Sequence, residues 1–356
     1  MNRECDREPN VDASLLRVLT AQFVARDLHP QRDIDQFERL ALGLVEGVDA
    51  AQAADVAIDL CRHFETPPSV VFKLFEKGGA CAHAALEHAR TLPQADLKVR
   101  AEYGPTDEAR AIARRAGLDR ELAGLLAQRP ESAVLHALAA NPDAILDPTA
   151  RRALVQAGRD DPALGRLLLA RSDIDIDPAA LYLAAGPEDR LAILLGACRE
   201  TLAAPIADVT PRIEASLLAR LEAAAIARDP EALAAALADG LDCRKGRVRA
   251  MTLDDGGEPL ALALAALGTP PDAAARILMC GAGAYAQDHL QIRALVTLMR
   301  STPSRAAMQI VAAITGAPRP EREATRRSAG REETSKIRHK PATRAGQAEK
   351  RHDRTA

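Results

Sequence analysis

Four stretches in the middle of the chain read ALEHARTL (85–92), AIARRAGL (111–118), ALAANPDAI (137–145) and LLLARSDI (167–174). Each closes a helix-like segment on a polar residue and then returns to an apolar one. The polar residues Arg90, Arg115, Asn141 and Arg171 follow one another at intervals of 25, 26 and 30 residues. Degenerate repeats of this length are typical of stacked helical hairpins, because one hairpin cannot bury its apolar face alone. We therefore predict an all-α solenoid, with an irregular helical bundle as the competing interpretation.

The composition of the whole chain also favours helices. Of 356 residues, 75 are Ala and 45 are Leu, against 5 Phe, 3 Tyr and no Trp. Ala and Leu are strong helix formers, whereas strands favour the β-branched and aromatic residues that are scarce here. A β-sandwich, a β-barrel or a Rossmann core is therefore not expected. The small side chains indicate many close helix contacts in place of one thick core.

Helix boundaries are marked by recurring short signals. An Asp or Thr followed by proline is typical of a helix start, since the side-chain oxygen accepts from free amides and proline at the first position needs no donor. These pairs are Thr66-Pro67, Asp147-Pro148, Asp161-Pro162, Asp177-Pro178, Thr210-Pro211, Asp229-Pro230 and Thr302-Pro303. Phe37, Leu40, Ala41, Leu44 and Val45 form one helical stripe, which predicts a helix beginning near Asp35.

Charge divides the chain into an acidic body and a basic tail. The net charge is −3, but residues 316–356 hold 12 basic and 6 acidic residues, which leaves −9 for residues 1–315. The tail has Ile337 as its only large apolar side chain, so we predict that it is disordered. The predicted organisation is a flexible N-terminus (1–12), a helical-repeat array (13–205), a helical region that continues the array or forms a separate domain (206–315), and the disordered basic tail (316–356).

The order of segments resembles the bacterial domain-of-unknown-function family 2336, whose members are HEAT-like helical repeats. The resemblance covers roughly residues 15–315. It rests on FERLALGLVEG (37–47), PPSVVFKLFEKG (67–78), AIARRAGL, LAANPDAIL (138–146), LLARSDIDIDPAAL (168–181), EPLALALAALGTPPDAAARILM (258–279) and IRALVTLM (292–299). These are soft patterns of Leu, Ala and Arg. The resemblance implies a HEAT-like α-solenoid and no activity, because the family has no agreed one.

Several short patterns resemble metal-binding or catalytic motifs, but none meets the requirements of such a site. Two C-x-H units, Cys61-Arg-His63 and Cys81-Ala-His83, could supply zinc ligands, but residues two apart on a helix point in nearly opposite directions. The run of Asp173, Asp175 and Asp177 lacks the glycine and glutamate of a calcium loop, and we expect Asp177 to cap a helix instead. The sequence contains no nucleophile elbow and no phosphate-binding loop. We predict no catalytic residue, no metal site and no cofactor.

The predicted function is therefore a non-catalytic protein-interaction module, a scaffold or adaptor with an unknown protein partner. The candidate partner-binding residues are Arg90, Arg115, Asn141 and Arg171, together with the basic patch Arg244, Lys245, Arg247 and Arg249. The alternative is nucleic-acid or acidic-partner binding through the patch and the tail. A third alternative is an uncharacterised enzyme. The six scattered cysteines and the absence of a signal-peptide or membrane-spanning pattern predict a cytoplasmic protein.

Overall fold

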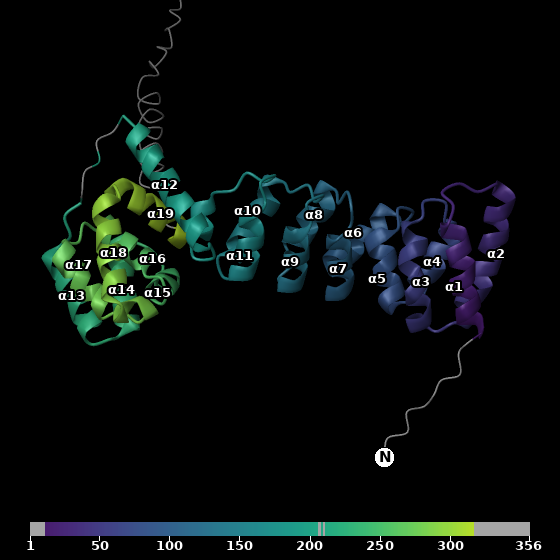
Figure 1. The fold of residues 1–356 in the computed structure, drawn as a ribbon, viewed down its shortest axis with the longest axis horizontal. Helices are drawn as coiled ribbons and strands as arrows, with labels where there is room; N and C mark the ends of the chain where they lie inside the picture. Colours follow the sequence, from purple (N-terminus) through teal and green to yellow (C-terminus); the bar gives the residue numbers. More distant parts are fainter. Residues whose placement is uncertain (1–10, 206–207, 209–210, 317–356) are drawn as a thin grey trace, which may run out of the picture. The chain divides into compact units, whose positions relative to one another are not determined.

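The computed structural model of the protein describes residues 11–205, 208 and 211–316, and this part of the chain is helical (Figure 1). It contains nineteen α-helices, two short 3₁₀-helices and no strand within the described residues. The all-α fold class predicted from the sequence is confirmed. The predicted disorder of the tail, and most of the predicted flexible N-terminus, lie outside the described residues. No helix of the described part is long and apolar enough to cross a membrane.

The chain divides into two compact units, Met1–Glu200 and Thr201–Ala356. We call them unit 1 and unit 2. The α-helices of unit 1 are α1 (Val11–Val24), α2 (Gln31–Gly47), α3 (Ala50–Arg62), α4 (Pro68–Glu76), α5 (Gly79–His88), α6 (Gln94–Tyr103), α7 (Thr106–Ala113), α8 (Arg120–Ala127), α9 (Ser132–Ala140), α10 (Pro148–Gly158) and α11 (Pro162–Leu169). The 3₁₀-helix η1 (Pro178–Leu181) follows, and α12 (Pro187–Ala203) runs across the division.

Alternate helices of unit 1 stack on one another. The odd-numbered helices α1, α3, α5, α7, α9 and α11 each pack on the next odd-numbered one. Among the even-numbered helices α2 packs on α4, α6 on α8 and α8 on α10. Figure 1 shows α7, α9 and α11 in one row and α6, α8 and α10 in another. This two-layered stacking of hairpins is compatible with the predicted solenoid.

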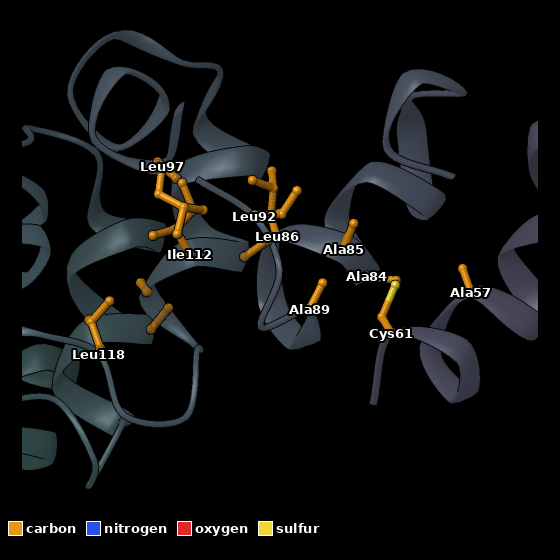
Figure 2. Packing of buried hydrophobic residues seen from close by; sticks show 14 of the residues in the cluster. Ala57, Cys61, Ala84, Ala85, Leu86, Ala89, Leu92, Leu97, Ile112 and Leu118 are labelled. Carbon is orange, nitrogen blue, oxygen red and sulfur yellow. The ribbon is translucent and has the colours of Figure 1, made fainter. Parts of the chain in front are cut away.

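Small side chains line the most extensive helix contact in unit 1, the one between α3 and α5. Ala57 and Cys61 of α3 and Ala84 of α5 lie at this contact, whereas the larger Leu86, Leu97 and Ile112 lie on the side toward α6 and α7 (Figure 2). Ala57 and Ala85 are fully buried. Helices carrying alanine can approach closely, so the alanine-rich composition is used as packing surface as well as for helix propensity.

The Asp-Pro signals start helices as predicted, whereas two of the Thr-Pro signals are displaced by one residue. Asp147, Asp161 and Asp229 cap α10, α11 and unit 2's α14 (Pro230–Leu241), and Asp177 caps η1. At Thr66-Pro67 and Thr302-Pro303 the proline itself takes the N-cap position, without a side-chain cap. Thr302 instead ends the preceding helix, because its hydroxyl donates to Leu298 O at 2.7 Å. The remaining Thr-Pro pair, Thr210-Pro211, lies partly outside the described residues.

Unit 2 is built around one helix that is apolar from its second residue onward. Besides α14 its helices are α13 (Ala215–Ile226), α15 (Lys245–Thr252), α16 (Glu258–Ala266), α17 (Pro271–Met279), η2 (Ala284–Gln287), α18 (His289–Ser301) and α19 (Ser304–Thr315). Every residue of α16 from Pro259 to Ala266 is buried. The neighbours that cover this helix are α15, α17, α18 and α19. A helix that is apolar on all sides is typical of the centre of a core.

Candidate functional site

Three of the four recurring polar residues of the repeat bind the main chain of the preceding repeat. Arg115, just after α7, donates from Nη1 to Leu86 O at 2.5 Å and from Nη2 to Ala89 O at 2.6 Å, at the end of α5. Asn141, which ends α9, donates from Nδ2 to Ala113 O and Arg115 O, both at 2.8 Å, at the end of α7. Each residue therefore joins the end of its own helix to the end of the helix two before it.

Arg171 makes the same connection one repeat later. After α11, its guanidinium donates to Asn141 O at 3.0 Å and to Ala144 O at 3.3 Å, and it also pairs with Asp173. The last carbonyls of a helix have no partner within it and carry partial negative charge, so an arginine or an amide is well suited to satisfy them. Burial lowers the pKa of Arg115. The periodicity seen in the sequence therefore has a structural cause.

Arg90 does not take part in this series. Its side chain is exposed, and it makes none of these reach-back bonds to α3. The four residues that the sequence aligns thus divide into three that hold consecutive repeats together and one that faces solvent. Their predicted role in binding a partner stays a prediction.

Further reach-back bonds occur that the sequence analysis missed. Lys77, at the end of α4, donates from Nζ to Val48 O at the end of α2. Arg129, just after α8, donates from Nη1 to Ala101 O at 3.2 Å and Gly104 O at 2.9 Å at the end of α6. His63 Nε2 lies 2.8 Å from Arg26 O. The signal common to these residues is a long polar side chain at the end of a helix, which is too frequent in any helical protein to be selective.

The basic patch of unit 2 lies at the start of α15 and is partly paired with a neighbouring helix. Lys245 Nζ is 2.9 Å from Glu231 Oε2 of α14, and Arg249 pairs with the same carboxylate. Arg244 is exposed at the N-cap of the helix. One acidic residue of the neighbouring helix therefore neutralises part of the patch, and nucleic-acid binding by Arg244, Lys245, Arg247 and Arg249 stays a prediction.

Ser132, His136 and Asp161 form the cluster in unit 1 that most resembles a catalytic one. Asp161 Oδ2 accepts from Ser132 Oγ at 2.7 Å and lies 2.7 Å from His136 Nε2, while Ser132 Oγ is 3.3 Å from His136 Nε2. A hydrolase triad needs the serine to donate to the histidine and the aspartate to hold the other ring nitrogen. Here serine and histidine meet on one carboxylate oxygen, which is not the arrangement of a triad. The cluster instead joins α9 to the N-terminus of α11, which Asp161 caps.

This cluster predicts an acid-sensitive contact between α9 and α11. The hydrogen bond from Ser132 is the main cause that lowers the pKa of Asp161 from 3.8 to about 2, and His136 adds to it. A folded-state pKa below the unfolded value gives stability that is present above about pH 4 and lost as the pH falls toward 2. We expect Asp161→Asn to lower the unfolding midpoint at pH 7, and the difference from the wild type to shrink between pH 4 and pH 2.

The control is Ser132→Ala. This variant removes the hydrogen bond that contributes most to the lowered pKa of Asp161, and it leaves the cap of α11 in place. In this variant the pKa of Asp161 should rise toward 3.8, measured by NMR titration of its carboxyl carbon. A pKa that stays near 2 would contradict the assignment.

The two C-x-H units do not converge on one point. Cys61 and Cys81 are buried, and desolvation raises the pKa of Cys61 to about 12. Cys81 Sγ donates to Ala50 O, and His63 turns to the carbonyl of Arg26. No group of three or more metal-ligating side chains is found within the described part of the chain. In the acidic run, Asp173 pairs with Arg171 and Asp177 caps η1, as the sequence indicated for Asp177.

An exposed apolar pair on α6 is a second feature that the sequence analysis missed. Val99 and Tyr103 lie one turn apart and are 60% and 76% exposed. The guanidinium of Arg100, between them in sequence, sits 4.4 Å from the ring of Phe75 in α4 and 2.6 Å from Glu108 of α7. A hydrogen bond to Glu102 raises the pKa of Tyr103. We call Val99, Tyr103 and the adjoining Asp96 and Glu102 the α6 face.

Unit 2 contains a cavity of about 320 Å³ between the ends of its helices. Its lining includes Arg228, Asp229, Cys280 and Gln287. Arg228 has a left-handed backbone (φ 51°), a conformation that costs a non-glycine residue of the order of 1 kcal/mol. The carboxylate of Asp229 is occupied as the cap of α14. Apart from this arginine, the lining offers no charge that is free to recognise a ligand.

Residues 81–195 match the model of the family described as "Uncharacterised protein conserved in bacteria (DUF2336)". The resemblance predicted from the sequence is thus confirmed over these residues, about a third of the chain, and the other motifs on which it rests lie outside the match. No curated protein matches, and no solved structure matches. The matched segment begins in α5 and ends in α12. It therefore includes the reach-back residues Arg115, Asn141 and Arg171 and the whole of the α6 face.

Proposed function

We propose that the protein is a non-catalytic protein-interaction module, and that its partner binds the α6 face. The observation that carries this proposal is the exposure of Val99 and Tyr103 on one side of one helix, within the segment that matches the family. The polar groups of the repeat are occupied in joining helix ends, which leaves the outward side chains as the surface available for recognition. The free and scattered cysteines support a cytoplasmic location.

The α6 face has the properties of a preformed binding site. Tyrosine is enriched among the residues that dominate binding energy, because it buries a large rigid area and keeps a polar end. Arg100 fixes the orientation of α6 against Phe75 and Glu108, so little order has to be gained on binding.

The charges around the α6 face specify the chemistry of the partner. Lys98 and Arg100, the basic residues of α6, are paired with Glu121 and Glu108. The acidic side chains Asp96 and Glu102 stay exposed beside the apolar pair. The face is therefore apolar with an acidic border. We propose a partner segment that presents an apolar residue flanked by Lys or Arg.

The proposal is tested by affinity capture with the full-length chain. Replacing Val99 by Glu and Tyr103 by Ala together should reduce recovery of the specific partner at least tenfold, since truncating a central anchor typically costs about 2 kcal/mol. The matched control is Ile145→Glu, which alters another apolar residue of the matched segment that is 56% exposed. The control should recover the partner at the wild-type level.

Quantitative mass spectrometry of the captured proteins gives the result. Recovery that is equal for the wild type and the double variant, or that falls equally in the Ile145 control, would contradict binding at the α6 face.

A further inference from the structure

The first helix of unit 1 has an outward face made of uncharged residues. Val11, Leu15 and Val18 are 69%, 52% and 56% exposed. Successive members are four and then three residues apart, so they lie in one line along α1. Between and beside them Ser14, Ala21 and Gln22 are also exposed. The opposite side of the same helix carries Leu16, Thr20 and Phe23, which are buried against unit 1.

Both charged residues of α1 are turned away from this face. Arg17 forms an ion pair with Asp55 of α3. Asp12 lies beside Gly47 at the end of α2, where a Cβ built on the glycine would come within 2.8 Å of its carboxylate oxygen. The charge of Arg17 is therefore paired within its own unit, and that of Asp12 lies at the end of α2. The outward stripe of Val11, Leu15 and Val18 stays free of charge over the whole helix.

The position of α1 in the stack explains why its apolar face lacks a cover. Each inner odd-numbered helix packs between two others, as α3 does between α1 and α5. Within the described residues α1 has a stacking neighbour on one side only, namely α3. Terminal repeats of helical stacks ordinarily have a polar outer face, because this face meets water. An apolar outer face at this position is typical of a surface that another helix covers.

Residues 1–10 and 317–356, which lie outside the described part of the chain, are poor candidates for that cover. Residues 1–10 and 317–356 contain only Met1 and Ile337 as large apolar residues, among many charged ones. An uncharged stripe needs an apolar partner surface of similar length. A second copy of the chain presents one, since its own α1 carries the same stripe.

We propose that two copies of the protein associate through antiparallel pairing of α1 with α1. The stripe of residues 11, 15, 18 and 22 is symmetric about a point midway between Leu15 and Val18. A two-fold axis at that point places Leu15 of one copy against Val18 of the other, twice, and Val11 against Gln22. Such an isologous contact closes on itself and stops at a dimer. The outward stripe of α1 and the α6 face are different surfaces, so this inference does not depend on the proposed function.

The register can be tested by complementary charges. In sedimentation velocity of the full-length chain, we expect a mass of twice 37.9 kDa that dissociates on dilution through the order of 10 µM, as for a small interface. Leu15→Glu or Val18→Lys alone should weaken the dimer about a hundredfold or more, because each buries an unpaired charge. An equimolar mixture of the two variants should recover dimer. In the mixed dimer the carboxylate introduced at position 15 of one copy faces the ammonium introduced at position 18 of the other, while the second Leu15–Val18 contact is intact.

Leu28→Glu is the matched control, because Leu28 is 73% exposed but lies after α1 and off the stripe. It should leave the dimer unchanged. All variants should keep wild-type helicity by circular dichroism, since the substituted side chains are exposed. A monomer at all concentrations up to about 200 µM, an assembly larger than a dimer, or a dimer that both single variants leave intact would overturn the proposal. A foreign protein bound to the stripe of a monomeric chain would also overturn it.

Discussion

Replacing Asn141 by leucine is expected to destabilise unit 1 by roughly 3 kcal/mol. Asn141 is 7% exposed, and its amide donates to two carbonyls, Ala113 O and Arg115 O, while its oxygen accepts from Asp143 N. Leucine has a similar size but can make none of these bonds. Each buried polar group left without a partner costs about 1–3 kcal/mol, and the lost contacts lie where α7 and α9 are joined. The shift is measured by urea unfolding.

Arg90→Leu is the matched control for this prediction. The sequence places Arg90 at the position equivalent to Asn141, but its side chain is exposed and outside the reach-back series. Its substitution should change stability by less than about 0.5 kcal/mol. Amide hydrogen exchange should show faster opening of α7 and α9 in the Asn141 variant alone. Equal unfolding midpoints for the two variants would show that the bonds of Asn141 do not hold the repeats together.

The repeat could be recognised from the sequence because its cause is local and periodic. A helix end needs a donor for its free carbonyls, so a polar residue after one helix can satisfy the end of the helix two before it, and this position recurs along the repeats. Arg115, Asn141 and Arg171 were therefore visible as a series. Their role was not, because the sequence cannot show whether an arginine at a helix end turns back to the preceding repeat or outward to solvent. Arg90 and Arg115 occupy similar motifs, but Arg115 binds carbonyls of the preceding repeat whereas Arg90 faces solvent.

The candidate surfaces were hidden from the sequence for a different reason. Val99 and Tyr103 read as ordinary members of a helix, and so do Leu15 and Val18. Exposure depends on which neighbours cover a helix, and this follows from the order of stacking along the whole unit. The same holds for the basic patch of α15. Glu231 neutralises part of it from the neighbouring helix α14, and only the fold brings these two helices side by side.

Gly268→Ala is expected to destabilise unit 2 by about 3 kcal/mol. Gly268 ends α16, the central helix of the unit, and has a left-handed backbone (φ 68°) that costs alanine roughly 1 kcal/mol. A Cβ at this position would also lie 1.7 Å from Pro211 O and 2.6 Å from its carbonyl carbon. These are backbone atoms that cannot rotate away. Relieving the overlap requires the segment at Pro211 to move, for which a cost of about 2 kcal/mol is typical of overpacking.

Two other glycines separate the two causes. Gly117 also has a left-handed backbone (φ 66°), but a Cβ there would meet nothing within 4 Å, so Gly117→Ala should cost only about 1 kcal/mol. Gly43 lies inside α2 with nothing within 4 Å and without a positive φ, so Gly43→Ala should stabilise the protein by roughly 0.5–1 kcal/mol. Urea unfolding of the three variants should therefore give two losses of unequal size and one gain. If Gly268→Ala costs no more than Gly117→Ala, the segment at Pro211 yields freely and does not fix the end of α16.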